Sequence, residues 1–155
     1  MAYWSSGEVL TAADLNDAIS VLQTVQTTYS TQVSNSTATY ADTGLSATIT
    51  PESTDSKILV TACHTFGKTA GFSENRVAWL LRRDSTAIWY SGTIELYTAT
   101  ALLLIAPFTI SYLDSPSTTS AVTYKTQFMN PYGTSAAISQ YGSGTATMTL
   151  MEISA

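Results

Sequence analysis

The sequence is poor in the residues that build metal centres and hydrolytic active sites. It contains one cysteine, Cys63, and one histidine, His64. One cysteine excludes an intrachain disulfide framework and any multi-cysteine zinc site, and one histidine excludes a metal site with two histidine ligands. Consecutive side chains on a strand point to opposite faces, so Cys63 and His64 cannot form a nucleophile–base pair with each other.

Both residues are therefore expected to be structural. Cys63 ends an apolar stretch that begins at Ile58, and we predict a buried, inert thiol. For His64 we predict a structural or solvent-facing position, with pH sensing or ligand binding as the alternative.

Charge is also scarce. Only 11% of the 155 residues are charged, about half the usual share, and six of them are basic. With a net charge of −5 and one adjacent basic pair, Arg82-Arg83, the chain lacks the clustered cations that grip nucleic acid. Ser and Thr supply about three residues in ten, so the surface is polar but uncharged. Such a surface suits Thr-rich strands and protein faces that are covered by other copies.

Long apolar runs are absent. The longest, 101–108, is far too short to cross a bilayer, and the first residues lack the basic and apolar regions of a signal peptide.

The 142–144 segment, Gly-Ser-Gly, reads as a turn and no helix start or Lys follows it, so it is not a phosphate cradle. Acidic residues are scattered over predicted turns; a distant carboxylate pair of the glycosidase kind remains open. We expect no membrane insertion, no cofactor, no metal and no enzymatic activity.

A heptad pattern dominates the first part of the chain. Thr11 can cap a helix, and no Pro or Gly follows it before residue 33. Steps of four and three give an a/d seam with one polar layer: Leu15, Ile19, Leu22, Gln26, Tyr29 and Val33. The spacing predicts a helical oligomerisation stalk over 11–34, because its exposed face lacks the Glu/Lys pairs that stabilise a lone helix. A single amphipathic helix folded onto the domain is the alternative.

Two aromatic residues, Tyr3 and Trp4, precede this stretch. They could staple the start of the helix, but terminal aromatics bury a large area when they dock, so we favour an anchor over 1–10 that binds another protein.

From residue 40 onward the period changes to that of strands. Alternating segments are expected at 45–50, 57–63, 77–82, 87–91, 93–97, 101–113, 121–129, 136–141 and 145–153, with a hairpin turn at 83–86. About eight short strands without βαβ alternation predict an antiparallel β-sandwich or jelly roll over 40–155. Four aromatics fall in its strands or loops, Trp79, Trp89, Tyr90 and Tyr97, and most of these four are expected in the core. The candidate ligand-facing aromatics are Phe72 and Tyr132, which fall in loops and could stack on sugars.

Several segments carry a resemblance to a known family. The segments are 40–51 (YADTGLSATITP), 56–60 (SKILV), 112–128 (YLDSPSTTSAVTYKTQF) and 147–153 (TMTLMEI). They resemble the carboxy-terminal β domain of bacteriophage fibre proteins, and 7–16 (GEVLTAADLN) is similar to the opening of phage tail- and head-fibre chains. The resemblance implies a virion surface protein, a homotrimer with a β-rich knob on a short helical stalk, and it supplies no catalytic motif.

The short chain narrows the expected function. With hardly any shaft between anchor and knob, we expect a capsid decoration protein or short head fibre, made in the bacterial cytoplasm and bound through its N-terminus to a capsid or tail protein. The alternative is a tail-fibre-type receptor-binding protein that recognises host surface glycans. An enzyme such as a depolymerase is a more distant third.

Overall fold

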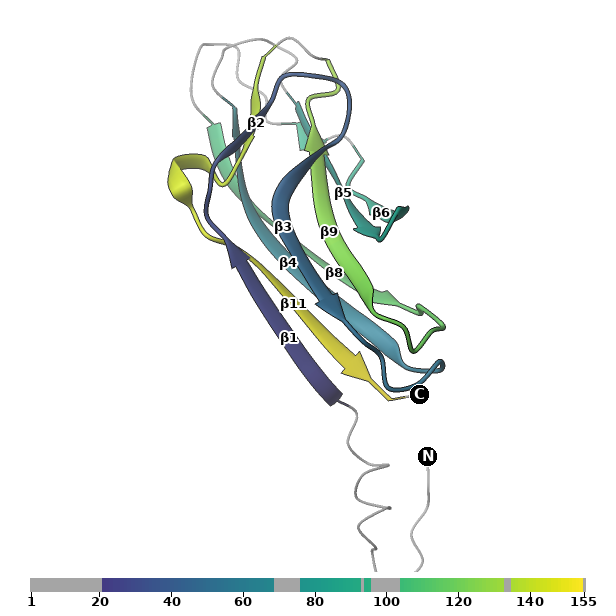
Figure 1. The fold of residues 1–155 in the computed structure, drawn as a ribbon. Coiled ribbons are helices and arrows are strands. Elements are labelled where there is room, and N and C mark those ends of the chain that lie inside the picture. The colour runs from purple at the N-terminus through teal and green to yellow at the C-terminus, as the bar shows by residue number, and fades with distance from the viewer. Residues whose placement is uncertain (1–20, 69–75, 93, 96–103, 133–134, 155) are drawn as a thin grey trace, which may run out of the picture.

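The computed structural model describes residues 21–68, 76–92, 94–95, 104–132 and 135–154, and these form two antiparallel sheets (Figure 1). The first sheet contains β1 (Val21–Tyr29), β2 (Val33–Asn35), β4 (Lys57–Lys68), β8 (Leu104–Asp114), β10 (Ala137–Ser139) and β11 (Ala146–Ile153). The second contains β3 (Ala41–Ile49), β5 (Arg76–Arg83), β6 (Thr86–Tyr90), β7 (Ile94–Glu95) and β9 (Val122–Met129). The prediction of a mainly antiparallel β protein is confirmed.

Strand order decides which strands lie at the edges of the two sheets. In the first sheet β11 lies between β1 and β4, β8 lies on the other side of β4, and β10 and β2 continue the sheet at its far end. In the second sheet the order is β3-β9-β5-β6, with β7 also paired with β5. In the described part of the chain the longer edge strands, called the edge strands below, are β1 and β8 in the first sheet and β3 and β6 in the second. The short strands β2 and β7 also lie at edges.

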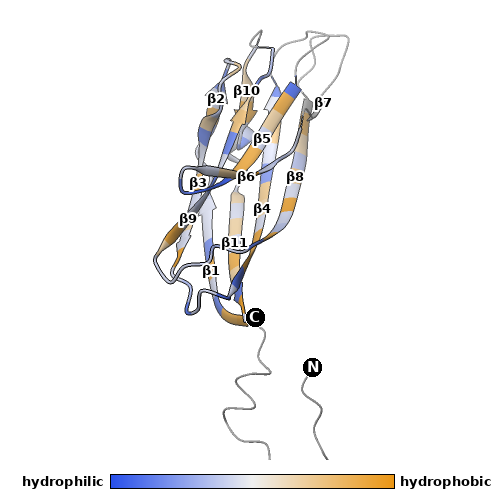
Figure 2. Cartoon of the chain, turned by 90° about the vertical axis from the view of Figure 1, so that its right-hand side faces the viewer, coloured by the Kyte–Doolittle hydropathy of each residue, from blue (hydrophilic) through white to orange (hydrophobic). Residues whose placement is uncertain are grey.

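The core lies between the sheets, as expected for a β-sandwich. Hydrophobic residues recur along β4, β8 and β11 between less hydrophobic ones (Figure 2). The inward-facing residues join one cluster that includes Val60, Phe66, Trp79, Phe128 and Leu150, each at most 1% exposed. Alternation of inward apolar and outward polar residues is the period that the sequence showed from residue 40 onward.

The helix predicted over 11–34 is wrong for residues 21–34. Val21–Tyr29 is a strand paired with β11, and Val33 begins β2. Five of the nine β1 residues are β-branched and one is aromatic, so the segment suits a pleated sheet better than a helix. The heptad spacing of Leu22, Gln26, Tyr29 and Val33 does not form a helical seam. The structure has no α-helix in its described part, and residues 11–20 lie outside that part.

Tyr29 instead fixes β1 against the second sheet. Its ring lies over Gly44, where a register shift interrupts the pairing of β3 with β9. Gly44 has a φ of +91°, and an added Cβ would lie 2.2 Å from Tyr29 Cε1. Glycine is needed here both for the left-handed backbone and for the space that the ring occupies.

A partly buried ion pair joins the two sheets at the end where β8 finishes. The Asp114 carboxylate accepts hydrogen bonds from Arg83 Nη1 (2.8 Å) on β5 and from the Tyr124 hydroxyl (2.7 Å) on β9. Burial raises the pKa of Tyr124, and its hydrogen bond to the charged Asp114 raises it further. Both partners of Asp114 belong to the second sheet, so this carboxylate ties the two layers together.

Glu152 on β11 provides a second buried carboxylate near the start of β1. Its side chain is 0% exposed and accepts hydrogen bonds from Gln23 Nε2 and from the Glu52 backbone N–H (2.7 Å). Burial alone would raise the pKa of Glu152, but these hydrogen bonds favour the charged form and lower it overall. The carboxylate thus ties β1 to the turn after β3.

Candidate functional site

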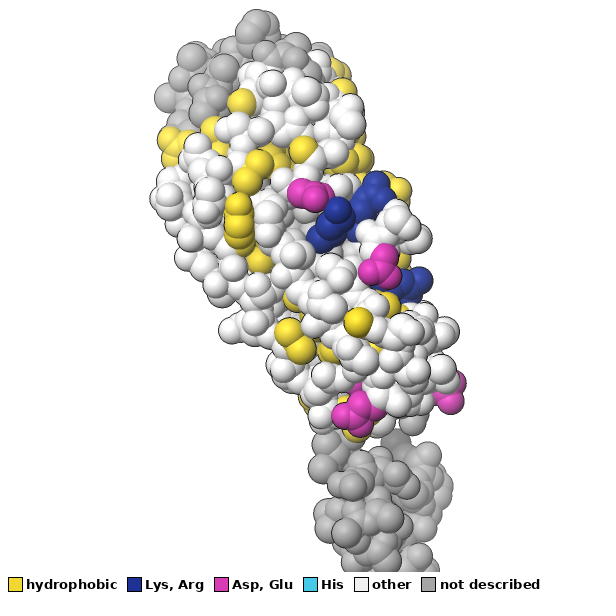
Figure 3. Space-filling view, viewed as in Figure 1, with side chains coloured by type: hydrophobic (Ala, Val, Ile, Leu, Met, Phe, Trp, Pro, Cys, Tyr) yellow, Lys and Arg dark blue, Asp and Glu magenta, His cyan; other side chains and the backbone are white. Residues whose placement is uncertain are grey.

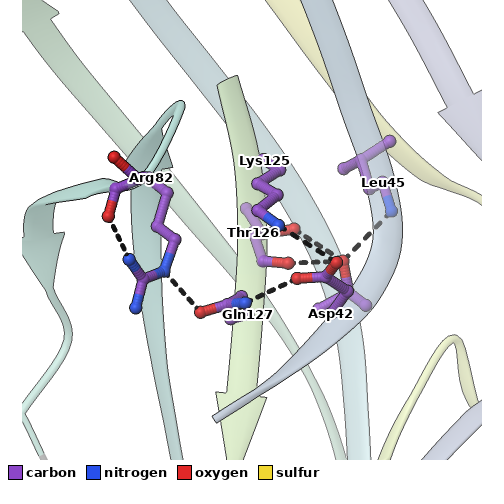
Figure 4. Close-up of polar contacts among 8 residues, drawn as sticks. Asp42, Leu45, Arg82, Lys125, Thr126 and Gln127 are labelled. Atoms are coloured by element: carbon purple, nitrogen blue, oxygen red, sulfur yellow. Dashed lines mark hydrogen bonds and ion pairs between the residues drawn. The ribbon is translucent and has the colours of Figure 1, made fainter. Parts of the chain in front are cut away.

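The outer face of the second sheet carries a hydrogen-bonded ladder of polar side chains. Arg82 Nε donates to Gln127 Oε1 (2.6 Å), and Gln127 Nε2 donates to Asp42 Oδ1 (2.6 Å). Lys125 Nζ completes the set by donating to Asp42 Oδ2 (3.1 Å). Figure 4 shows these four side chains in series across β5, β9 and β3. We call Arg82, Gln127, Asp42 and Lys125 the polar ladder.

Strand register explains why these residues meet. Arg82 lies opposite Lys125, and Asp42 lies opposite Gln127, so the ladder occupies two neighbouring rows of the sheet. In sequence Asp42 and Lys125 are 83 residues apart. Lys and Arg side chains gather beside acidic ones over this part of the surface, and most of the remaining visible face is uncharged (Figure 3).

The electrostatics of the ladder favour an ionised Asp42. Burial alone would raise its pKa, but the hydrogen bonds from Gln127 and Lys125 and the charges of Lys125 and Arg82 lower the pKa overall. The charged groups of the ladder are two cations and one carboxylate, so it has a positive balance in a chain whose net charge is −5. It is a set of fixed donors and acceptors on an open surface, suited to binding polar groups.

Two tyrosines extend the ladder at one end. Tyr90 on β6 is 58% exposed, and its ring meets that of Tyr40 edge-on with the centroids 6.5 Å apart. Tyr90 lies opposite Leu80, which lies opposite Gln127, so the tyrosine pair adjoins the ladder row. Of the aromatics of which most were predicted in the core, Trp79 is 1% exposed and Trp89 packs against the core, whereas Tyr90 lies on the surface.

Tyr132 is the described member of the candidate ligand-facing pair. It follows β9, is 42% exposed, and has the Arg76 guanidinium carbon 4.8 Å above its ring centroid. Its exposure agrees with the prediction, and no contact in the structure tests ligand binding there. Phe72 lies outside the described residues, as do Tyr97 and the predicted anchor and stalk residues Tyr3, Trp4, Leu15 and Ile19.

His64 sits at the centre of a buried polar network between the sheets. It is 0% exposed, with Nε2 2.9 Å from Thr126 Oγ1 and Nδ1 3.2 Å from Gln140 Nε2. Because the Gln140 amide nitrogen can only donate, Nδ1 accepts and Nε2 carries the proton. Thr126 Oγ1 lies 2.7 Å from Thr43 Oγ1 on β3, so the network crosses from one sheet to the other.

Burial lowers the pKa of His64 to about 4, so the ring is neutral at physiological pH. The imidazole is also stacked on Phe66, with the ring centroids 5.2 Å apart. This buried environment supports a structural role for His64. Cys63 faces the opposite side of β4 and is half-buried, so its predicted full burial is wrong.

The outer face of the first sheet is almost free of charge. Its side chains form three rows across β1, β11, β4 and β8, which are Thr24-Met151-Leu59-Leu113, Gln26-Thr149-Thr61-Ser111 and Thr28-Thr147-Cys63-Thr109. None of these residues is Asp, Glu, Lys, Arg or His. Lys57 is charged but lies at the end of the face, opposite Ile153. We call these three rows the uncharged face.

Exposed apolar residues lie at both margins of the uncharged face. Val21 and Leu22 on β1 are 42% and 36% exposed, and Leu113 on β8 is 48% exposed. Sequence reasoning missed both this face and the polar ladder. Strand alternation could have identified the outward residues, but only the strand order shows which of them are neighbours.

The described residues hold no group of three or more His, Cys, Asp or Glu side chains arranged to bind a metal ion. Within the same part of the chain, no helix is long and apolar enough to pass through a membrane.

Comparisons with known proteins add little to this description. No protein-family model and no curated protein matches the chain. One matching solved structure is described as the structure of infectious bursal disease virus Gt strain. The identity is 12%, the match covers the whole of this chain and 42% of that chain, and the TM-score is 0.36. At that score the likeness supports no argument about fold or function, and the resemblance to phage fibre domains stays a prediction.

Proposed function

We propose that the chain is a non-enzymatic structural protein of a bacteriophage virion, a homotrimeric capsid decoration protein or short head fibre on the virion surface. The observation that carries the proposal is the uncharged face. Its exposed apolar margins are costly to leave in water, and its three rows of uncharged side chains are suited to contact with protein. The sequence resemblance to phage fibre domains supplies the virion context.

Self-association fits this face better than binding of a charged partner. Interface cores are depleted in charge, and the rows of Thr, Ser, Met and Leu can pack against the same rows of another copy. The polar ladder lies on the other sheet and stays in solvent when the uncharged face is covered. In such a homotrimer the uncharged face is buried between copies, and the polar ladder lies on the outside.

The two ends of the sheets suit the proposed attachment. β1 begins at Val21, opposite Ile153 near the end of the chain, whereas Tyr132 follows β9 at the other end. An anchor that includes Tyr3 and Trp4 would bind a capsid or tail protein at the first end. The loops near Tyr132 would then point away from the particle.

We also propose that the sandwich is a jelly roll. β1 with β2, β6 with β7, and β10 with β11 can each be taken as one interrupted strand, which leaves eight strands. The chain then changes sheet at every connection except the β5–β6 hairpin, as in a double Greek key. Jelly rolls recur among virus capsid domains, which is compatible with the proposed role.

Recognition of a host surface glycan is the second candidate function. The polar ladder and the adjoining Tyr40–Tyr90 pair favour it, because aromatic faces stack on sugars and fixed polar groups bind hydroxyls. Titration of purified host polysaccharide into the full-length protein, compared with Tyr90→Ala, tests it. Saturable binding that Tyr90→Ala weakens at least tenfold is expected, and absence of saturable binding to the wild type would remove this candidate.

Immunogold labelling of phage particles that carry this chain tests the virion role. An antibody against residues 40–155 is expected to label the head of intact particles. Label on the tail alone would favour the receptor-binding alternative, and particles without label would contradict both virion assignments.

A further inference from the structure

The four edge strands differ in how well they are protected against pairing with another chain. Exposed edges offer unpaired N–H and C=O groups, and proteins usually blunt them with charges, prolines, bulges or short strands. β3 has the Gly44 bulge and Asp42, β6 has five residues, and β8 contains Pro107. β1 has nine residues, VLQTVQTTY, without a charge or a proline, and its register shift against β11 lies at its first residues, between Val21 and Gln23.

β1 is thus a long, uncharged edge, and in the described part of the chain only β11 pairs with it. Its outward side chains at positions 22, 24, 26 and 28 are all exposed and all uncharged. Such an edge is a ready template for one more antiparallel strand. The structure also offers a suitable strand on the other margin of the same sheet.

β8 lies level with β1 across the sheet and runs antiparallel to it. The row of Thr24 ends at Leu113, and the row of Thr28 ends at Thr109, so β1 lies level with the half of β8 that follows Pro107. Each neighbouring pair from β1 through β11 and β4 to β8 is antiparallel, so β1 and β8 run in opposite directions. A neighbouring copy in the same orientation can therefore add its β8 to β1 without breaking the antiparallel order.

We propose that copies of this chain join head to tail through strand pairing of β1 with the β8 of the next copy, and that three copies close the ring. This inference rests on the proposed homotrimer and names where its subunits meet. Exposed Val21 and Leu22 at one margin then approach exposed Leu113 at the other, which buries apolar surface on both. The uncharged face turns toward the shared axis, and the charged polar ladder stays on the outside.

A two-fold alternative is less well matched. Pairing of β1 with another β1 is also antiparallel, but it sets Val21 toward the Tyr29 end of the second strand and leaves Leu113 exposed. It also gives a closed dimer, since an isologous contact uses the same patch on both copies. Only the heterologous contact uses both apolar margins.

Substitutions on the edge strands test the proposal in the full-length protein. Thr24→Lys with Thr28→Lys adds the charges that natural edges use, and it should convert the trimer to a monomer in light scattering. Thr48→Lys is the matched control, because Thr48 is an exposed outward residue on edge strand β3, and it should leave the trimer intact. A trimer that persists in the double variant would overturn the edge pairing and leave the homotrimer standing, whereas a monomeric wild type would overturn both.

Cross-linking keeps the test valid if the Lys variant fails to fold. In a Cys63→Ser background, chains with Leu22→Cys and chains with Leu113→Cys are treated with a short bis-maleimide, separately and mixed. Head-to-tail pairing predicts covalent pairs only in the mixture, and covalent trimers when one chain carries both cysteines. Pairs formed by Leu22→Cys alone would show β1–β1 contact and contradict the proposal, as would absence of cross-links in the mixture.

Discussion

His64 shows how one buried residue sets the acid stability of the domain. It lies between the sheets, with Thr126 on one ring nitrogen and Gln140 on the other. Protonation would place a second N–H against the Gln140 amide and bury a positive charge without a carboxylate among its hydrogen-bonding partners. The folded structure therefore favours the neutral form of the His64 imidazole.

The expected consequence is a loss of stability between about pH 6.5 and pH 4. The pKa of His64 falls from 6.5 in the unfolded chain to about 4 in the folded one. Above pH 6.5 neither state is protonated; as the pH falls through this window only the unfolded state takes up the proton, so the stability decreases. The full effect is about 3 kcal/mol, and it is complete below pH 4.

Urea unfolding at pH 7, 6 and 5 measures this effect. His64→Gln removes the titrating group and is expected to unfold more easily at pH 7 but to lose less stability between pH 6.5 and 5. Glu152 and Asp42 have lowered pKa values, so their contributions are lost at more acid pH and do not mask the comparison. An equally steep loss of stability in His64→Gln would contradict the assignment.

At the scale of elements, the junction of β1 with β3 depends on a glycine and a tyrosine. Tyr29 ends β1 and its ring occupies the space beside Gly44, so the interrupted strand β3 and the edge strand β1 hold each other in place. β1 is paired on one side only, which makes this contact important for keeping the strand in the sandwich.

Gly44→Ala is expected to destabilise the domain more than Gly92→Ala. Both glycines have positive φ, at +91° and +69°, so both substitutions carry a backbone cost of roughly 1–2 kcal/mol. Gly92 has open space around an added Cβ, whereas at Gly44 the Tyr29 ring must also move. Thermal unfolding of the two variants measures the difference, and equal losses would contradict the packing described for Tyr29.

The elements also show what the sequence could and could not predict. From residue 40 onward, alternation predicted most strands and the Asp84-Ser85 turn of the β5–β6 hairpin correctly, because inward apolar residues alternate with outward polar ones. In β1 the inward residues include Gln23 and Thr27, so alternation was weak and chance heptad spacing dominated. The β-branched residues of this segment correctly indicated a strand.

Contacts between distant strands were beyond prediction from one sequence. Asp42 could be placed on an outward face, but its partners Lys125 and Gln127 lie on a strand more than 80 residues away. The same holds for His64, whose network draws on Thr126 and Gln140, 62 and 76 residues along the chain. Local periodicity fixes which side of a strand a residue occupies, whereas strand order decides its neighbours.

On the scale of the whole molecule, the two sheets differ in the surfaces that they present. One outer face has the polar ladder and the Tyr40–Tyr90 pair, and the other has three uncharged rows with apolar margins. This asymmetry is what the proposed assembly uses, because covering the uncharged face leaves the polar face in solvent. The proposals on virion attachment and on edge pairing both depend on self-association.

The solution mass of the full-length wild-type protein, measured by light scattering, tests that self-association most directly. A homotrimer has three times the 16.5 kDa mass of one chain, and we expect that mass to stay unchanged on dilution through the micromolar range. A mass of one chain at all concentrations would contradict the homotrimer and, with it, the role assigned to the uncharged face.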